Sequence, residues 1–325
     1  MDSHAYVLRA NGEFHEVALA TKGIAASWEG DVNGASESET FKERMREQWN
    51  EIAARSHRWA PVMRAQIAPA TELMLDLAHL RPGDRVLDIA AGEGYQSVAA
   101  ALRVGSSGYV MAVDLAPEQV KHAAAAAREA GIHHIETMVM DAESLDLPDG
   151  SFDAVLCQLG VMFLPDIDRG LREMLRVLTP GGRASLVIST PGGSPESDLV
   201  ASIVRGRVGA ATPMPARRSG ASLGAPGVMR QKMEAVGFQA VEAHELAVPL
   251  RLPSAEDAVN LVRDLHPTLD EMMAPLTADE REALWREVNQ ASAAFVGPDG
   301  FESPSRVVVV AGARSTEATS RQLPA

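Results

Sequence analysis

Residues 85–96 constrain the fold of this chain more than any other stretch. They begin with a short apolar run of the kind that a parallel strand covered on both faces requires: Val86, Leu87 and Ile89. Gly92 and Gly94 follow, which allow a sharp turn and leave no Cβ in the path of a ligand. From Gln96 the residues are good helix formers. The stretch therefore predicts a buried strand, a glycine turn and a helix N-terminus at the mouth of that turn.

A glycine turn of this kind has several readings. It can be an ordinary tight connection between a strand and a helix. It can also hold a dinucleotide, but the full fingerprint G-x-G-x-x-G would need a third glycine where Ser97 stands. The pattern actually present is Asp-x-x-x-Gly-x-Gly, starting at Asp88. The motifs that come later in the chain must decide between these readings.

Composition limits the classes of protein that fit. The 325 residues, 46% hydrophobic and 23% charged, suit one large α/β domain with additions or two small domains. No apolar run is long enough for a membrane span, and the N-terminus lacks the pattern of a signal peptide. Cys157 is the one cysteine, so no intramolecular disulfide can form, and we expect a cytoplasmic protein. The net charge of −14 argues against nucleic acid as a partner.

Ahead of the glycine stretch the chain has two parts. Residues 1–38 are poorly patterned and are expected to form an N-terminal extension, with a short hairpin near residues 6–17. Residues 39–80 have helical spacing, with a separate helix expected from Thr71. Because these helices are additional to the core, they are candidates for a homo-oligomer interface.

After the glycine stretch, strands and helices alternate. The expected strands lie at residues 108–114, 135–140, 154–160 and 183–190, with helices at 96–102, 117–130 and 167–178. Connections of helix length predict a doubly wound parallel sheet that binds ligands at the carboxyl ends of its strands. Asp114, at the end of the second strand, lies where a nucleotide-binding unit places a carboxylate for both ribose hydroxyls. Asp141 could accept a hydrogen bond from an adenine amino group, and Ala142 leaves room for the ring.

Four motifs occur in the order and spacing of one family. They are the Asp-x-x-x-Gly-x-Gly pattern, the acid Asp114, the pair Asp141-Ala142, and residues 176–183 with their Leu-Thr-Pro-Gly-Gly turn. Together they resemble class I S-adenosylmethionine (SAM)-dependent methyltransferases. Residues 141–155 resemble more narrowly the ubiquinone/menaquinone-biosynthesis-type branch of that family. The resemblance covers residues 41–190 and does not reach the segments that would select an acceptor.

The resemblance implies SAM as cosubstrate and a seven-stranded Rossmann-like sheet whose last strand is antiparallel. Residues 39–80 would close over the cosubstrate, residues 81–192 would bind it, and residues 193–315 would supply a helical substrate cap and the last two strands. Residues 316–325 would be a tail. Asp88 would orient the glycine loop or meet the methionyl amino group, and Trp49 and Trp59 are candidates for contact. The implied cosubstrate set is Asp88, Ala90, Gly92, Gly94, Tyr95, Asp114, Leu115, Asp141, Ala142, Gln158, Leu159 and Trp59.

Beyond residue 190 the pattern predicts helices at 195–209, 228–236 and 254–296 and strands at 238–252 and 306–312. Methyl transfer is an in-line displacement that needs positioning and the exclusion of water more than covalent chemistry. A hydroxyl acceptor would benefit from a general base, for which His266 is the first candidate, followed by His244 and Glu245. No metal-ligand spacing is evident.

The sequence thus predicts a methyltransferase that acts on a hydrophobic small molecule of secondary or isoprenoid-quinone metabolism, at oxygen or carbon. Two alternatives remain at this point: a nicotinamide-dependent oxidoreductase, and a binding or cyclase-type protein that keeps the cosubstrate pocket without transferring methyl.

Overall fold

The computed structural model describes residues 4–8, 14–18, 35–192, 195–208, 223–265, 269 and 272–316. The chain divides into two compact units, Met1–Lys42 and Glu43–Ala325. In the first unit, β1 (His4–Leu8) and β2 (Phe14–Ala18) form an antiparallel hairpin, which confirms the predicted one. Helix α1 (Ala35–Ser56) starts in this unit and continues into the second.

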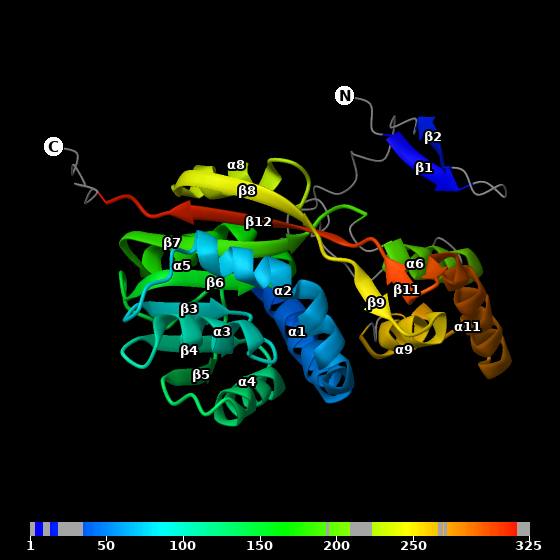
Figure 1. Ribbon diagram of the computed structural model, residues 1–325, viewed down its shortest axis with the longest axis horizontal. Helices are drawn as coiled ribbons and strands as arrows, with labels where there is room; N and C mark the ends of the chain where they lie inside the picture. The colour runs from blue at the N-terminus through cyan, green and yellow to red at the C-terminus, as the bar shows by residue number, and fades with distance from the viewer. Residues whose placement is uncertain are drawn as a thin grey trace. The chain divides into compact units, whose positions relative to one another are not determined.

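The second unit is built on a seven-stranded sheet with the order β5-β4-β3-β6-β7-β12-β8 among the described residues (Figure 1). Strands β3 to β7 are parallel, while β12 is antiparallel to both β7 and β8. The prediction of a doubly wound sheet with its last strand antiparallel is confirmed. The strands are β3 (Arg85–Ile89), β4 (Tyr109–Asp114), β5 (Ile135–Val139), β6 (Phe152–Gln158), β7 (Leu178–Ser189), β8 (Gln239–Ala247) and β12 (Arg306–Ala313).

Helices cover both faces of this sheet because its strands are apolar on both sides. Along β6, Val155 and Cys157 enter one hydrophobic cluster, whereas Ala154 and Leu156 enter the other. The first cluster includes α5 (Ile167–Val177) and α8 (Val228–Val236), and the second includes α2 (Ala60–Leu77) and α3 (Tyr95–Val104). Helix α4 (Pro117–Glu129) packs beside α3 and against β4 and β5.

The connection between β5 and β6 differs from the expected alternation, because residues 140–151 contain no helix. Side chains of α5 pair with its backbone instead. Glu173 accepts the N–H of Leu145 at 2.9 Å, and Arg176 donates to the carbonyls of Leu145 and Leu147 at 2.9 and 2.7 Å. These bonds satisfy backbone groups that a helix would otherwise satisfy internally.

Three further boundaries differ from prediction. Helix α2 runs through the exposed Pro69, so Thr71 does not begin a new helix. The Thr-Pro-Gly-Gly turn lies inside β7, which begins at Leu178. The strand expected at residues 238–252 divides into β8 and β9 (Leu250–Leu252) around Pro249, which has no N–H to donate to a ladder.

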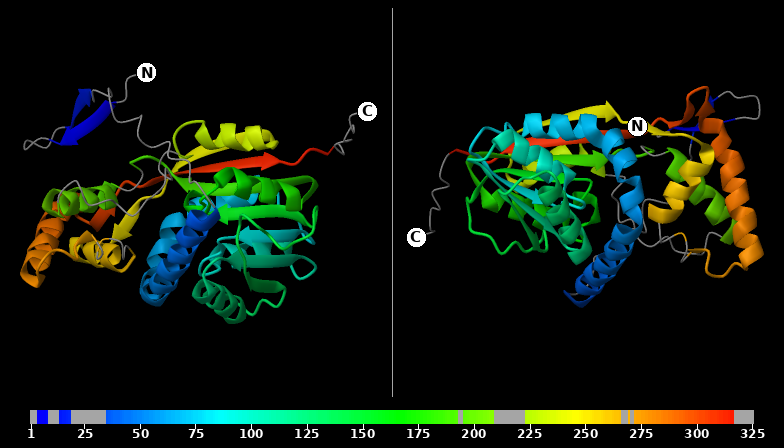
Figure 2. Two further views of the ribbon diagram at one scale, coloured as in Figure 1. Left: turned by 180° about the vertical axis from the view of Figure 1, so that it is seen from behind. Right: turned by 60° about the horizontal axis from the view of Figure 1, so that its bottom comes forward.

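A second layer, here called the cap, follows β7. It contains α6 (Pro195–Val208), α9 (Ala255–Leu265), α11 (Ala278–Ser292) and a small sheet of β10 (Val296–Gly297), β11 (Gly300–Ser303) and β9. The three helices share a hydrophobic cluster separate from those of the main sheet. The yellow and red strands in Figure 2 join the cap to the main sheet, through β8–β9 and β11–β12.

Within the part of the chain that the structure describes, no helix has both the length and the apolar character to cross a membrane.

Candidate functional site

Two residues at the carboxyl edge of the main sheet have a strained backbone. Ala90, directly after β3, has φ +55°, and Leu159, directly after β6, has φ +56°. Residues with a side chain rarely adopt such angles, and they persist only where the surroundings hold them. Here the two turns hold each other, because a Cβ on Gly160 would lie 2.3 Å from the Cβ of Ala90. The turns after β3 and β6 therefore form one preformed surface.

The two glycines of the loop have different roles. Gly92 has φ +55°, and a Cβ built on it would meet nothing within 4 Å. Gly94 has φ +79°, and its Cβ would lie 2.7 Å from the Cα of Ala123 in α4. Only Gly92 thus fits the prediction of a glycine that leaves space for a ligand. Gly94 instead allows α4 to pack against the loop, which the sequence pattern did not indicate.

Asp114 joins β4 to the glycine loop. One carboxylate oxygen accepts the N–H of Gly92 at 3.0 Å, and the other accepts the N–H of Ala116 at 2.9 Å, just beyond Leu115. Burial raises the pKa of this carboxyl, and the backbone N–H groups oppose that rise. Each carboxylate oxygen has further acceptor capacity, so a ligand with two hydroxyls can still be bound beside the loop.

Asp88 has no exposed surface, and its carboxylate forms hydrogen bonds with neighbouring side chains of the protein. The hydroxyl of Ser97 donates to one of its oxygens, and Nε2 of Gln96 donates to the other at 3.4 Å. Gln96 also donates to the carbonyl of Ala91 at 3.1 Å. Burial raises the pKa of Asp88 to about 7. Asp88 therefore orients the glycine loop, and Ser97, where a dinucleotide site has glycine, is its hydrogen-bond partner.

After β5, Asp141 and Ala142 begin a tight turn. Oδ1 of Asp141 accepts the N–H of Glu143 at 2.9 Å, and its carbonyl accepts the N–H of Ser144 at 3.0 Å. Glu143 is buried and accepts the N–H of Asp166 at 2.6 Å, which ties the turn to the start of α5. The turn beside β4 is thus held by its own backbone and by α5.

Helix α1 contacts the loops on both sides of β3. Oδ1 of Asn50 accepts the N–H of Glu118 at the start of α4, at 3.1 Å. The Trp49 ring lies edge to face with Phe163, with centroids 5.1 Å apart. At the end of α1, the hydroxyl of Ser56 donates to Oε1 of Glu93 in the glycine loop at 2.8 Å.

Helix α2 makes two more contacts of this kind. The guanidinium of Arg64 lies 3.4 Å from the ring centroid of Tyr95, and the pKa of Tyr95 is raised mainly by burial. The hydroxyl of Thr71 donates to Oε1 of Gln158 at 2.6 Å. The structure therefore brings the predicted residues 88–95, 114–115, 141–142 and 158–159 to one edge of the sheet, beneath α1 and α2.

Buried polar atoms without partners lie at the same edge. They are Oε2 of Glu93, Oε1 of Gln119 and Nδ1 of His122. Buried polar groups are normally paired, so these atoms and the open space at Gly92 fit a polar ligand held by the loop and α4. The sequence analysis missed all three residues. Gln119 and His122 are three apart on the helix that follows Asp114, and that spacing was the available signal.

Trp59 lies elsewhere. Its side chain packs with Leu250, Leu252 and Phe301 of the cap, and its indole N–H donates to Asp264 at 2.6 Å. Among the candidate bases, His266 lies outside the described residues. His244 and Glu245 are exposed on the edge strand β8, where they pair with Glu242 and Arg306.

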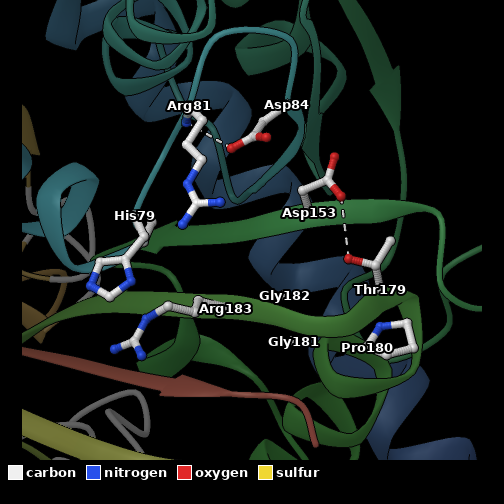
Figure 3. Close-up of a pocket in the computed structure, with 10 residues that line it drawn as sticks. His79, Arg81, Asp84, Asp153, Thr179, Pro180, Gly181, Gly182 and Arg183 are labelled. Carbon is white, nitrogen blue, oxygen red and sulfur yellow. Dashed lines mark hydrogen bonds between the residues drawn. The ribbon is translucent and has the colours of Figure 1, made fainter. Parts of the chain in front are cut away.

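A separate cavity of about 240 Å³ lies at the opposite, amino edge of the parallel strands (Figure 3). His79, Arg81 and Arg183 line one part of it, and Asp153 lies in another, hydrogen-bonded to Thr179 at 3.3 Å. Arg183 is paired with Glu242 at 2.6 Å. None of the residues of the predicted cosubstrate set lines this cavity.

Among the described residues no group of three or more His, Cys, Asp or Glu side chains is arranged to hold a metal ion.

Comparison with known proteins agrees with this geometry. A family model described as "Methyltransferase domain" matches residues 87–186. Nocamycin O-methyltransferase of Saccharothrix syringae is 34% identical over 202 residues, which cover 59% of this chain and 72% of that protein. Aklanonic acid methyltransferase DauC of Streptomyces sp. (strain C5) is 40% identical over 115 residues, which cover 35% of this chain and about half (52%) of that protein.

Among solved structures, the YcgJ protein of Bacillus subtilis has the same fold, with a TM-score of 0.51 at 21% identity, covering 77% of this chain and 100% of that one. The comparisons do not single out the quinone-biosynthesis branch, which stays a prediction. The ordered motifs, the sheet order and these relatives together show that the chain belongs to the class I SAM-dependent methyltransferases.

Proposed function

We propose that this chain transfers a methyl group from SAM to a hydrophobic small molecule of secondary metabolism. Two relatives support this acceptor class, since one carries nocamycin and the other aklanonic acid in its name. The observation that carries the proposal is the link between Asp114 and the N–H of Gly92, beside the space left open at Gly92.

Each end of the cosubstrate would have its own set of residues. Asp114 would accept the ribose hydroxyls, while Asp141 and Ala142 would bind the adenine ring. Gly92 would lie against the methionyl portion, with the unpaired oxygen of Glu93 available to its ammonium group. The chemistry that SAM supplies when bound is an activated methyl group on a sulfonium.

The chain itself would contribute positioning and the exclusion of water. In this proposal the helices of residues 39–80 cover the donor, residues 81–192 bind it, and residues 193–315 cover the acceptor and complete the sheet. We favour oxygen as the methylated atom, because a relative that matches 59% of this chain is named an O-methyltransferase. His266 remains the proposed general base for a hydroxyl acceptor.

The test has two steps. Calorimetry with S-adenosylhomocysteine (SAH) and with NADH would first establish the cosubstrate. We expect the protein to bind SAH but not NADH. Mass spectrometry would then follow methylation of aklanonic acid and of a panel of hydroxyaryl compounds in the presence of SAM. Binding of NADH but not SAH would favour the oxidoreductase. Binding of SAH without transfer to any acceptor would favour the non-methylating protein.

A further inference from the structure

Two neighbouring residues of α1 reach opposite sides of the glycine loop. Asn50 binds the start of α4, which follows β4, while Trp49 packs against Phe163 of η2 (Val161–Phe163), which follows β6. Strand β3 and its glycine loop lie between β4 and β6 in the sheet. Helix α1 therefore crosses above the loop, with Trp49 and Phe163 on the β6 side.

The β6 side is the side on which an acceptor would approach. The residues proposed to bind the nucleoside, Asp114 and Asp141, follow β4 and β5 on the other side of β3. In the proposed pose the methionyl portion lies at Gly92, after β3, so the sulfonium lies nearer to β6 than the nucleoside does. In-line attack then requires the acceptor on the far side of the methyl group, beside η2.

The geometry of the aromatic pair leaves ring surface available. The planes of Trp49 and Phe163 are 82° apart, so the edge of one ring meets the face of the other. Such an arrangement does not use both faces of either ring, and a third flat ring can stack beside it. Both side chains are only half-buried, and in the described part of the chain neither ring packs against a third aromatic ring or against a cation.

The residues that flank Phe163 are apolar. Met162 and Leu164, on either side of Phe163, are also half-buried, and both pack against the main core. The chain has only four Trp, three Tyr and seven Phe residues, and two of these aromatic side chains meet at this edge.

We propose that Trp49 and Phe163 form an aromatic wall of the acceptor site and select flat, conjugated acceptors over saturated ones. The inference rests on the proposed function and narrows its substrate class. It also assigns a role to α1 beyond covering the donor.

The experiment compares two probes of nearly the same size, 2-naphthol and its saturated analogue decahydro-2-naphthol. Calorimetry measures their binding to protein loaded with SAH. Wild-type protein is expected to bind 2-naphthol about tenfold more tightly, the order expected for one or two aromatic contacts. Trp49→Leu and Phe163→Leu, which keep apolar volume but remove a ring, should bring the ratio of the two affinities close to one.

Two controls separate the wall from general effects. Phe163→Tyr keeps the ring and should keep the preference, and Tyr109→Phe, at the amino end of β4 and so at the opposite edge of the sheet, should leave the preference unchanged. Every variant should still bind SAH, which reports its folding at this edge, and the preference is read as a ratio of two affinities measured on the same SAH-loaded protein. An unchanged preference in both leucine variants, no preference in the wild type, or binding of neither probe would overturn the inference. Failure of the wild type to bind SAH would instead overturn the proposed function, and the inference with it.

Discussion

The two edges of the main sheet each hold a buried or half-buried aspartate that anchors the backbone, yet they differ in what is left unsatisfied. At the amino edge, Asp153 accepts the N–H of Arg85 at 2.9 Å and the hydroxyl of Thr179, beside an open cavity. At the carboxyl edge, Asp114 makes two similar bonds, but the loop and helix beside it hold buried polar atoms without partners, on Glu93, Gln119 and His122. Backbone strain does not separate the edges, since His79 beside the amino-edge cavity has φ +54°. The comparison teaches that unmet hydrogen bonding, rather than concavity or strain, distinguishes the carboxyl edge.

The largest expected effect concerns Asp88, just inside the carboxyl edge. Its pKa is raised from 3.8 to about 7 by burial, so the folded state favours the protonated form. From about pH 4 to about pH 7 the unfolded chain loses this proton first, and the free energy of unfolding falls as pH rises, by up to about 4 kcal/mol. The variant Asp88→Asn has no titrating group at this position, so its free energy of unfolding should not show this decrease.

The thermal midpoint of the wild type should therefore fall relative to that of Asp88→Asn as pH rises from about 4 to about 7. Differential scanning calorimetry across that window measures it. A difference that stays flat with pH would show that Asp88 ionises normally, and the carboxyl edge would lose one of its distinguishing features.

The glycine loop offers a matched pair of variants. Gly94→Ala places a Cβ against the backbone of α4 at a left-handed φ and should cost about 3 kcal/mol of stability. Gly92→Ala meets open space and should cost only about 1 kcal/mol, yet weaken SAH binding about tenfold. Chemical denaturation and calorimetry separate the two effects. Equal stability losses, with SAH affinity intact in Gly92→Ala, would mean that the space at Gly92 holds no ligand.

Asp114 and Asp153 allow the edges to be compared directly. Asp114→Ala should weaken SAH binding by about 1–3 kcal/mol, since it removes the hydrogen bonds proposed to the ribose hydroxyls and also frees the glycine loop. Asp153→Ala removes similar backbone bonds at the other edge and should lower stability without changing SAH affinity. Calorimetry with both variants is decisive: parallel losses of affinity would abolish the distinction between the two edges.

The smallest effect is expected at Trp59. Trp59→Phe removes the hydrogen bond to Asp264 but keeps the ring among apolar residues of the cap, so about 1 kcal/mol of stability should be lost. SAH affinity should stay within about twofold of the wild type, because a packing role is local to the cap. A loss of SAH affinity near tenfold would restore the sequence-based prediction that this tryptophan contacts the cosubstrate.

Most of the main sheet could be predicted because its signals are local. A run such as Val86 to Ile89, a glycine turn and a following helix lie within a dozen residues, and their spacing is independent of the rest of the chain. The loop at residues 140–151, which interrupts the alternation of strands and helices, could not be predicted in this way, since its backbone is satisfied by Glu173 and Arg176, more than 25 positions away.

The outer parts of the site depend on still more distant pairs. Trp59 and Asp264 are 205 positions apart, and nothing in either neighbourhood indicates the other. The role of Gly94 depends on its contact with Ala123, which no turn pattern reveals. The position of Asp114 at the end of β4, beside the glycine loop, could be predicted for the opposite reason: a strand tip and its spacing from the glycines are properties of one short segment.

The position of β12 has a consequence for how the chain is made. This strand lies between β7 and β8, yet it follows both of them and the whole cap in the sequence. During synthesis β8 therefore has no partner in the main sheet until Arg306–Ala313 leave the ribosome, and β7 keeps an open edge. Such edges favour pairing with other chains. Strands β3 to β7, which carry the glycine loop, are synthesised long before β12 can pair with β7 and β8. A nascent chain therefore passes through a stage in which these strands are paired with one another while the edges of β7 and β8 are still unpaired.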